Sequence, residues 1–136
     1  MAIPSRYREG IVELGDGHIV VTCSPMERAL WLYPLDNWQN LEQTILGLPS
    51  LNSTAQKLRK FLIGHAHDCE IDGSGRILLP GSLRDYALLH KDVSLVGQLN
   101  RFEIWSTEYW DAKREELLAE DLLSQPLPVE LESVTF

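Results

Sequence analysis

The chain contains an internal repeat, and this feature constrains its fold more than any other. The segment IPSRYRE at 3–9 is echoed by LPGSLRD at 79–85, and ALWLYPLDNW at 29–38 matches RFEIWSTEYW at 101–110. The copies lie between 72 and 76 positions apart, which is longer than the repeats that stack into solenoids. We therefore predict two related halves that pack together.

The repeat divides the chain into four segments. We predict a first half at 1–38, a helical linker at 39–65, a second half at 66–109, and a C-terminal helix with an acidic tail at 110–136. Hydrophobic residues make up 44% of the 136 positions, which is enough for a core that folds without disulfides or metal. The expected fold class is α+β, mainly a β core with helices, in one compact domain.

Local patterns predict the elements within these segments. Short apolar runs predict strands at 18–22, 69–72, 76–79, 93–97 and 102–105. The second and third of these runs flank a Gly-rich turn and predict a hairpin. Pro80 suits the first position of a short helix, and Ser53 is the expected cap of the linker helix. Capping and periodicity predict the longer helices at 36–46, 54–62 and 107–122, followed by an irregular tail.

Charge is unevenly distributed along the chain. The net charge is −8, yet residues 1–101 hold eleven acidic and ten basic side chains, whereas 102–136 hold nine acidic and two basic. The acidity therefore belongs to the C-terminal end, which leaves room for a basic surface on the remainder. Candidates for that surface lie on the linker helix and near the start of the chain, at Lys57, Arg59, Lys60, Arg6 and Arg8.

The sequence shows no feature of a membrane or secreted protein. No apolar run approaches the roughly 20 residues that cross a bilayer, and the N-terminus has no apolar signal core. Cys23 and Cys69 lack a C-x-x-C arrangement and are typical of reduced, buried thiols. We expect a cytoplasmic location.

Candidate chemistry is sparse. GHAHDC places His65, His67 and Cys69 at alternating positions, where a strand would aim them at one face that zinc could use. A fourth ligand at a familiar spacing is absent, so helix capping or core hydrogen bonding is the favoured interpretation. No serine or cysteine has an adjacent base and orienting group. We predict no enzymatic activity, no catalytic residue, no bound metal, no cofactor and no small-molecule substrate.

The loop from Asp72 to Arg76 has two interpretations. It lacks the glycine and lysine spacing of nucleotide-binding loops. Gly73 and Gly75 suit a tight turn in which Asp72 and Arg76 pair as a structural contact across adjacent strands. Alternatively, Arg76 contacts a phosphate or base of DNA while Asp72 or the turn orients it. Local sequence leaves both interpretations open.

The combined pattern closely resembles the MraZ transcriptional regulators of bacteria. The segments IPSRYRE, LIGHAHDCEIDGSGRILLPGSLRDYALL and VSLVGQLNRFEIW carry the resemblance in order, over about residues 1–120. It implies a tandem of two AbrB-like swapped-hairpin halves, assembled into a ring-shaped homo-oligomer. It also implies nucleoid-associated binding of double-stranded DNA at promoter direct repeats upstream of the division and cell-wall gene cluster, usually with repression. The alternative from another class is a protein-interaction or structural ring without DNA binding.

The resemblance also implies site residues. Asp72, Gly73, Gly75 and Arg76 match the Asp-x-x-x-Arg loop of the second half, with Pro80 and Arg84 following as expected. Arg76 and its turn are the best candidates for DNA contact, and Arg6, Arg8 and Arg84 are weaker ones. The equivalent loop of the first half would end just before Met1. We therefore expect residues 1–3 to be the interior of a family strand, with the family pattern beginning upstream.

Overall fold

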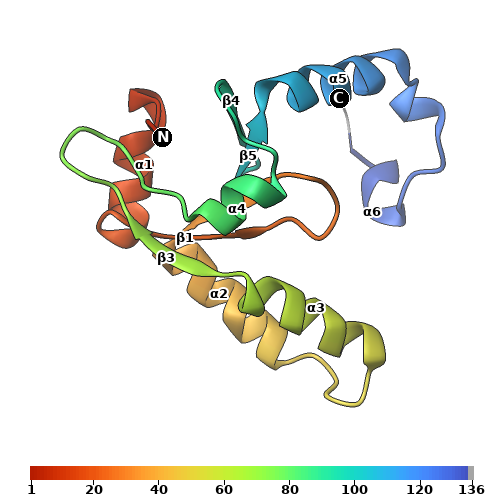
Figure 1. The fold of residues 1–136 in the computed structure, drawn as a ribbon. Helices are drawn as coiled ribbons and strands as arrows, with labels where there is room; N and C mark the ends of the chain where they lie inside the picture. The colour runs from red at the N-terminus through yellow and green to blue at the C-terminus, as the bar shows by residue number, and fades with distance from the viewer. Residues whose placement is uncertain (135–136) are drawn as a thin grey trace.

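A five-stranded antiparallel sheet forms the centre of the molecule (Figure 1). The computed structural model describes the backbone of residues 1–134 and the side chains of all of these residues except 13–15 and 132. Its strands follow the order β3-β1-β2-β5-β4, and each neighbouring pair is antiparallel. The strands are β1 at His18–Cys23, β2 at Leu30–Pro34, β3 at His67–Glu70, β4 at Val93–Gly97 and β5 at Phe102–Ser106.

Helices accompany both faces of this sheet, which confirms the predicted α+β class. The core on one face includes Ile11 of α1 and Leu83 of α4. The core on the other face includes Trp38 of α2 and Leu62 of α3. α5 follows β5 directly and extends away from the sheet (Figure 1). The helices are α1 at Ser5–Gly15, α2 at Leu35–Leu46, α3 at Ser53–Gly64, α4 at Gly81–Tyr86 and α5 at Thr107–Ala119.

The order helix, strand, strand, helix occurs twice, as α1-β1-β2-α2 and as α4-β4-β5-α5. Pro4 and Pro80 precede the first helix of each set with nearly the same φ, −54° and −56°. In the centre of the sheet β2 pairs with β5 so that Trp31 lies opposite Glu103, its equivalent in the sequence repeat. The two sets of elements are thus related by an approximate twofold axis through this pair.

Strand alternation explains why the sheet has two apolar cores. Leu32 of β2 belongs to the core beneath α1 and α4, whereas Trp31 and Tyr33 belong to the core beneath α2 and α3. All five residues of β2 are buried because this central strand is covered on both faces. Thr22 Oγ1 donates a buried hydrogen bond of 2.8 Å to the Leu62 carbonyl, which ties β1 to α3.

The segment around the Gly-rich turn differs from the predicted hairpin. The backbone of Asp72 and Arg76 closes the turn, but residues 76–79 do not continue as a second strand against 69–72. β3 pairs instead with β1, and the Ile77 N–H donates to the Met1 carbonyl at 2.7 Å. The hairpin prediction was wrong because local patterning does not reveal which distant segment lies at a strand edge.

Three further boundaries differ from the predictions. Asn52, not Ser53, caps α3, and its Oδ1 accepts from the Ala55 N–H at 2.9 Å. α5 ends at Ala119, three residues before the predicted position. The expected irregular tail contains a 3-10 turn at Leu122–Ser124 and a short helix, α6, at Val129–Glu132.

In the described part of the chain, no helix combines the length and the apolar character needed to cross a membrane.

Tyr86 joins α4 to the loop between β1 and β2. Its hydroxyl donates to the carbonyl of the buried Ser24 at 2.6 Å. We expect Tyr86→Phe to lower the free energy of unfolding by about 1 to 2 kcal/mol, because that carbonyl loses its donor in a largely buried position. Urea denaturation measures the change. Tyr109→Phe, at a site that is 45% exposed on α5, is the control; an equal effect in both variants would contradict this assignment.

Candidate functional site

Four hydrogen bonds hold the turn at residues 72–76, and the Asp72 carboxylate accepts two of them. Asp72 Oδ1 accepts from the Ser74 N–H at 2.8 Å and from the Arg76 N–H at 3.0 Å. The Gly75 N–H donates to the Asp72 carbonyl, and the Asp72 N–H donates to the Arg76 carbonyl, both at 3.0 Å. Four hydrogen bonds therefore fix the backbone on which the Arg76 side chain is carried.

The same contacts favour the charged form of Asp72. The Arg76 backbone N–H makes the largest contribution to holding the pKa of this carboxyl below its ordinary value of 3.8. The Ser74 N–H and the positive charge of Arg76 act in the same direction. Asp72 thus stabilises the turn through its backbone and is ionised at neutral pH.

The N-terminal segment lies against the far side of the turn. The Ile3 N–H donates to the Gly75 carbonyl at 2.7 Å, and Ala2 forms an isolated antiparallel bridge with Arg76. The Met1 ammonium donates to the Ile77 carbonyl at 2.8 Å. Residues 1–3 therefore run beside residues 75–77 as a short extended pair, and the turn is braced from two sides.

Arg8 reaches the turn from α1. Its Nε donates to the Ile3 carbonyl at 2.7 Å. Its guanidinium occupies the space that a side chain at position 75 would fill, and Gly75 has a φ of +74°. Only glycine meets both demands without strain, because it has no Cβ and adopts positive φ freely. The structure thus brings Arg8 to the Asp72–Arg76 turn.

The remaining predicted contact residues lie near the turn or on neighbouring helices. Arg76 is exposed, and its side chain forms no ion pair with any side chain that the structure describes. Arg6 is exposed on α1, with its Cζ 4.8 Å from the Tyr7 ring centroid. Arg84 is exposed on α4 and lines a pocket of about 200 Å³ together with Met1 and Ile77. The predicted arginines therefore lie on α1, α4 and the turn that the N-terminus joins.

Comparison with known proteins places the chain in a family. A family model described as "MraZ protein, putative antitoxin-like" matches residues 62–126. The protein named Transcriptional regulator MraZ from Alkalilimnicola ehrlichii is 49% identical over 135 residues, covering 99% of this chain and 89% of that protein. The chain belongs to the MraZ family. A protein with the same name from Legionella pneumophila strain Corby is 44% identical to this chain, and the match covers 98% of this chain and 88% of that protein.

The names of these relatives describe transcriptional regulators, which confirms the prediction that the chain is not an enzyme.

The two histidines of the GHAHDC segment contact nearby backbone carbonyls. His65 Nδ1 lies 2.7 Å from the Phe61 carbonyl at the end of α3, and His67 Nδ1 lies 3.0 Å from the His65 carbonyl. Among the side chains that the structure describes, no group of three or more His, Cys, Asp or Glu residues has a metal-binding arrangement. Burial raises the pKa values of the Cys23 and Cys69 thiols, which favours their protonated forms.

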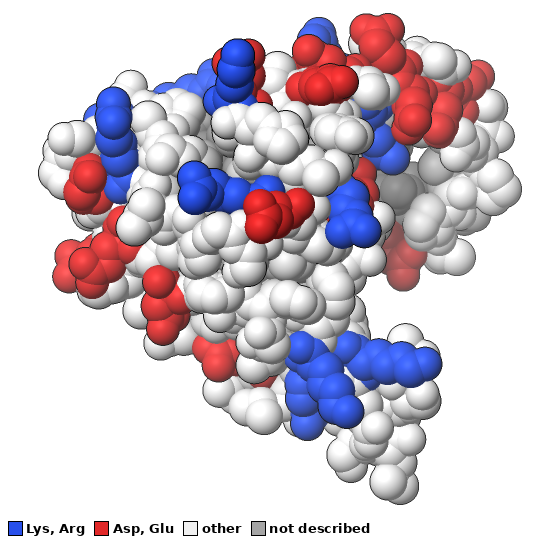
Figure 2. All heavy atoms as spheres, in the orientation of Figure 1, with Lys and Arg blue, Asp and Glu red and all other residues white. Residues whose placement is uncertain are grey.

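The basic surface predicted on α3 is smaller in the structure than the sequence suggests. Arg59 is half-buried, and its Nη2 donates to the Ile45 carbonyl near the end of α2 at 3.3 Å. Lys57 and Lys60 are exposed. In Figure 2 basic side chains gather over α3, at the end of the molecule away from α5. Arg59 therefore serves helix packing, and the two lysines carry the surface charge.

Sequence analysis missed the part that Met1 and Ile3 play at the turn. Their backbone groups bond to residues 75–77 across more than 70 positions of sequence. Neither residue has side-chain chemistry that marks it as functional. The spacing of Pro4 and Arg8 was the sequence signal for this contact. A helix that starts after Pro4 places Arg8 one turn further on, where it contacts Ile3.

The Asp72 contacts predict a pH dependence of stability. Because the folded-state pKa lies below the unfolded value of 3.8, the contribution is fully present above that value and is lost as pH falls through the folded pKa. We expect Asp72→Asn to destabilise the protein at pH 7 and to differ less from the unmutated protein at pH 3. Urea denaturation at both pH values measures this. Asp85→Asn, on the exposed side of α4, is the control. The prediction is contradicted if Asp72→Asn is less stable than the unmutated protein by the same amount at pH 7 and at pH 3.

Proposed function

We propose that this chain is a sequence-specific, DNA-binding transcriptional regulator that represses the bacterial division and cell-wall gene cluster. It binds double-stranded direct repeats upstream of that cluster as a ring-shaped homo-oligomer, in the cytoplasm and associated with the nucleoid. The names of its relatives support the regulatory part of the proposal. The location, the operator and the ring follow from the family resemblance.

The observation that carries the proposal is the braced turn at residues 72–76. The backbone that carries the exposed Arg76 is already held by several hydrogen bonds, so only the side chain must be ordered when it meets a phosphate or a guanine edge. Asp72 forms no ion pair with the Arg76 guanidinium among the described side chains, and its hydrogen bonds come from backbone N–H groups. Asp72, Gly73 and Gly75 therefore shape the turn, and Arg76 makes the main contact with DNA.

Arg8, Arg6 and Arg84 extend this surface in the proposal. Arg8 lies against Gly75, and Arg6 is exposed nearer the start of α1. Arg84 is exposed on α4, in the pocket that Met1 also lines. These side chains are suited to phosphate contacts, which add affinity without reading the sequence.

The proposed architecture is a pair of exchanged halves, with boundaries at 1–38, 39–65, 66–109 and 110–136. Two contacts support the exchange. β3 of the second half pairs with β1 of the first, and residues 1–3 pair with residues 75–77. Among residues 1–134, β4 has a neighbouring strand only at β5. The approximate twofold axis makes this β4 edge equivalent to the edge of β1 that β3 covers.

A ring explains how a chain of net charge −8 binds DNA. Each copy presents one braced turn, and several copies that contact successive repeats bind with a combined affinity far above that of one copy. The acidic excess lies at 102–136, and residues 1–101 carry nearly balanced charge. Charge on α5 and the tail is therefore separated in sequence from the proposed contact surface.

The second candidate function is a protein-interaction ring that does not bind DNA. The exposed apolar side chains of the C-terminal region favour it, since such residues mark protein contacts. They include Leu118, Leu122, Leu123 and Val129.

Fluorescence anisotropy separates the two functions. The full chain is titrated onto DNA from upstream of its own gene and onto a scrambled duplex, at two salt concentrations. The regulator predicts preference for the upstream DNA and an affinity that falls steeply with salt. Absence of binding to either duplex, together with salt-insensitive capture of a protein, would support the protein-interaction ring.

A further inference from the structure

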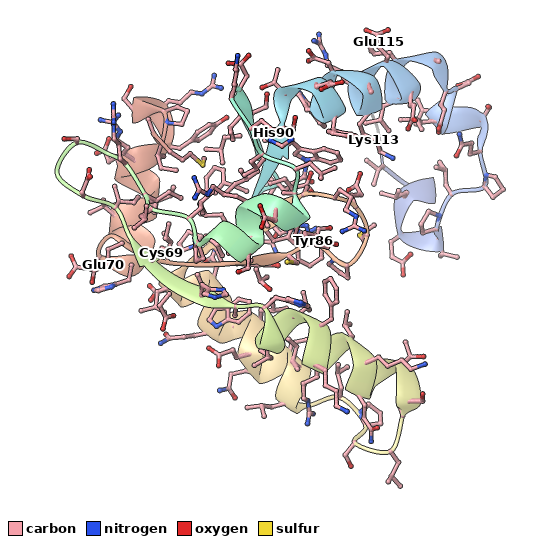
Figure 3. All side chains as sticks on the ribbon, in the orientation of Figure 1. Cys69, Glu70, Tyr86, His90, Lys113 and Glu115 are labelled. Carbon is pink, nitrogen blue, oxygen red and sulfur yellow. The ribbon has the colours of Figure 1, made fainter. Side chains whose placement is uncertain are left out.

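α5 is attached to the rest of the molecule along one side. Its Trp110 ring lies 5.6 Å from the ring of Trp105 in β5, and none of its residues is buried. Lys113 Nζ lies 3.7 Å from Glu27 Oε2 in the loop between β1 and β2. Figure 3 shows Glu115 on the opposite side of the helix, pointing away from the body. α5 therefore has a side, marked by Glu115, where no ion pair with a described side chain is found.

The outward face of α5 is acidic and ends in an apolar residue. Residues three or four positions apart lie on the same side of a helix. The exposed residues at this spacing are Glu108, Asp111, Glu115 and Leu118, and Leu118 is 68% exposed. Among the described residues, none of these carboxylates forms an ion pair. The face thus presents carboxylates without ion pairs next to an apolar side chain, and Glu108 and Asp111 also line a cavity with His90 and Lys91.

α3 has an outward face of the opposite charge. Residues 43–67 contain three lysines and arginines and no aspartate or glutamate, in a chain with 20 acidic residues. Because Arg59 is turned toward α2, the exposed stripe consists of Lys57, Lys60 and Ile63, which is 41% exposed. Neither lysine forms an ion pair with a side chain in the described part of the chain. α3 therefore presents two positive charges followed by an apolar residue.

The two faces match in order and lie at different ends of the molecule. Along α3 the order is Lys57, Lys60, Ile63, and along α5 it is Asp111, Glu115, Leu118. Figure 2 shows basic side chains gathered over α3 and acidic ones gathered over α5 and the C-terminal segment. Their separation within one copy favours a contact between copies over a contact within the chain.

We propose that α5 of one copy packs in parallel on α3 of the next copy, with Asp111 and Glu115 beside Lys57 and Lys60. Leu118 then lies beside Ile63. The contact uses different surfaces on the two copies, so it repeats head to tail and closes into a ring when the rotation between copies allows. This inference rests on the self-association in the proposed function and is independent of DNA binding.

Both parts of the contact are needed. Exposed ion pairs alone add little affinity, because each charge is already well hydrated. They orient the approach and exclude wrong pairings, while the Leu118–Ile63 contact removes apolar surface from water. In a closed ring every copy makes two such contacts, which stabilises the assembly beyond a single pair.

Sedimentation velocity of the full chain over a concentration series, without DNA, tests the proposal. Lys60→Glu and Glu115→Lys each place like charges together, and we expect each to weaken association by at least about tenfold. The double variant restores opposite charges in reversed order, and its association should return to within about threefold of the unmutated protein. Glu9→Lys, an equal charge change on the exposed side of α1, is the control and should leave association unchanged.

The outcomes separate this inference from the rest of the account. An oligomer whose mass is unaffected by both single variants would overturn the α3–α5 contact alone. A monomer at every concentration would overturn the contact and the ring, but not binding of DNA. If Lys60→Glu lowers affinity for DNA and leaves the mass unchanged, α3 is a nucleic-acid surface and the proposal is wrong.

Discussion

Replacing Arg76 with alanine is expected to reduce affinity for upstream DNA by at least about tenfold. An arginine contact to a base edge contributes about 1 to 3 kcal/mol, and a ring that engages several repeats loses that contribution in each copy. Fold stability should change by less than about 0.5 kcal/mol. The exposed Arg76 side chain has no ion pair among the described side chains, and the bond to Asp72 comes from its backbone N–H.

The salt dependence of the same variant distinguishes two roles for Arg76. If the side chain holds a phosphate, Arg76→Ala reduces the salt dependence and weakens binding to scrambled DNA as well. If it reads a base, the loss is confined to the upstream repeats. Arg28→Ala removes an equal charge from the exposed loop between β1 and β2 and is the control. Equal losses in both variants would show that the contact is not made by this turn.

Gly75→Ala is expected to lower the free energy of unfolding by about 2 to 4 kcal/mol. A left-handed φ costs an L-residue about 1 to 2 kcal/mol, and the new methyl group displaces the Arg8 guanidinium, which also loses its hydrogen bond to Ile3. Because Arg8 then leaves the turn, affinity for DNA should fall together with stability. Denaturant titration and anisotropy measure the two effects.

Gly73→Ala is the matched control for that variant. Gly73 lies in the same turn, but a Cβ at this position would meet no atom within 4 Å, and its φ is not positive. The substitution should therefore change stability by less than about 1 kcal/mol. If the two alanine variants are destabilised equally, the loss of glycine in the turn, and not the contact between Gly75 and Arg8, determines the change in stability.

Elements defined by neighbouring residues could be predicted from the sequence. The strand pair β4 and β5, the short helix after Pro80 and the helix α2 lie close to their predicted positions. Each depends on alternation, periodicity or a proline within a few positions. The repeat added the equivalence of the two sets of elements, because Trp31 and Glu103 occupy matching places in it and pair across the centre of the sheet.

Pairings between distant segments could not be predicted in this way. β3 pairs with β1, and the N-terminus pairs with residues 75–77, because those edges offer unpaired backbone groups that burial requires to be satisfied. Side-chain patterns carry no information on such edges. For the same reason Arg8 was identified as a basic residue near the start, while its position against Gly75 depends on the fold.

Charge gave a partial guide to the surface. The acidity of residues 102–136 was visible in the sequence, and apart from the buried Glu103 of β5 it lies on α5 and the segment beyond it. The cluster on α3 was overestimated, since Arg59 bonds to the end of α2. A linear count of charges does not reveal which long side chains pack along a neighbouring helix.

The most direct test of the central claim is affinity cleavage of upstream DNA from residue 74. An iron–EDTA group is attached through Ser74→Cys in a Cys69→Ser background, while the buried Cys23 remains in place. If the Asp72–Arg76 turn contacts the operator, strand cleavage is confined to the repeats and recurs once per repeat. Cleavage no greater than that from the same group at Ser124→Cys, or equal cleavage of scrambled DNA, would contradict the account.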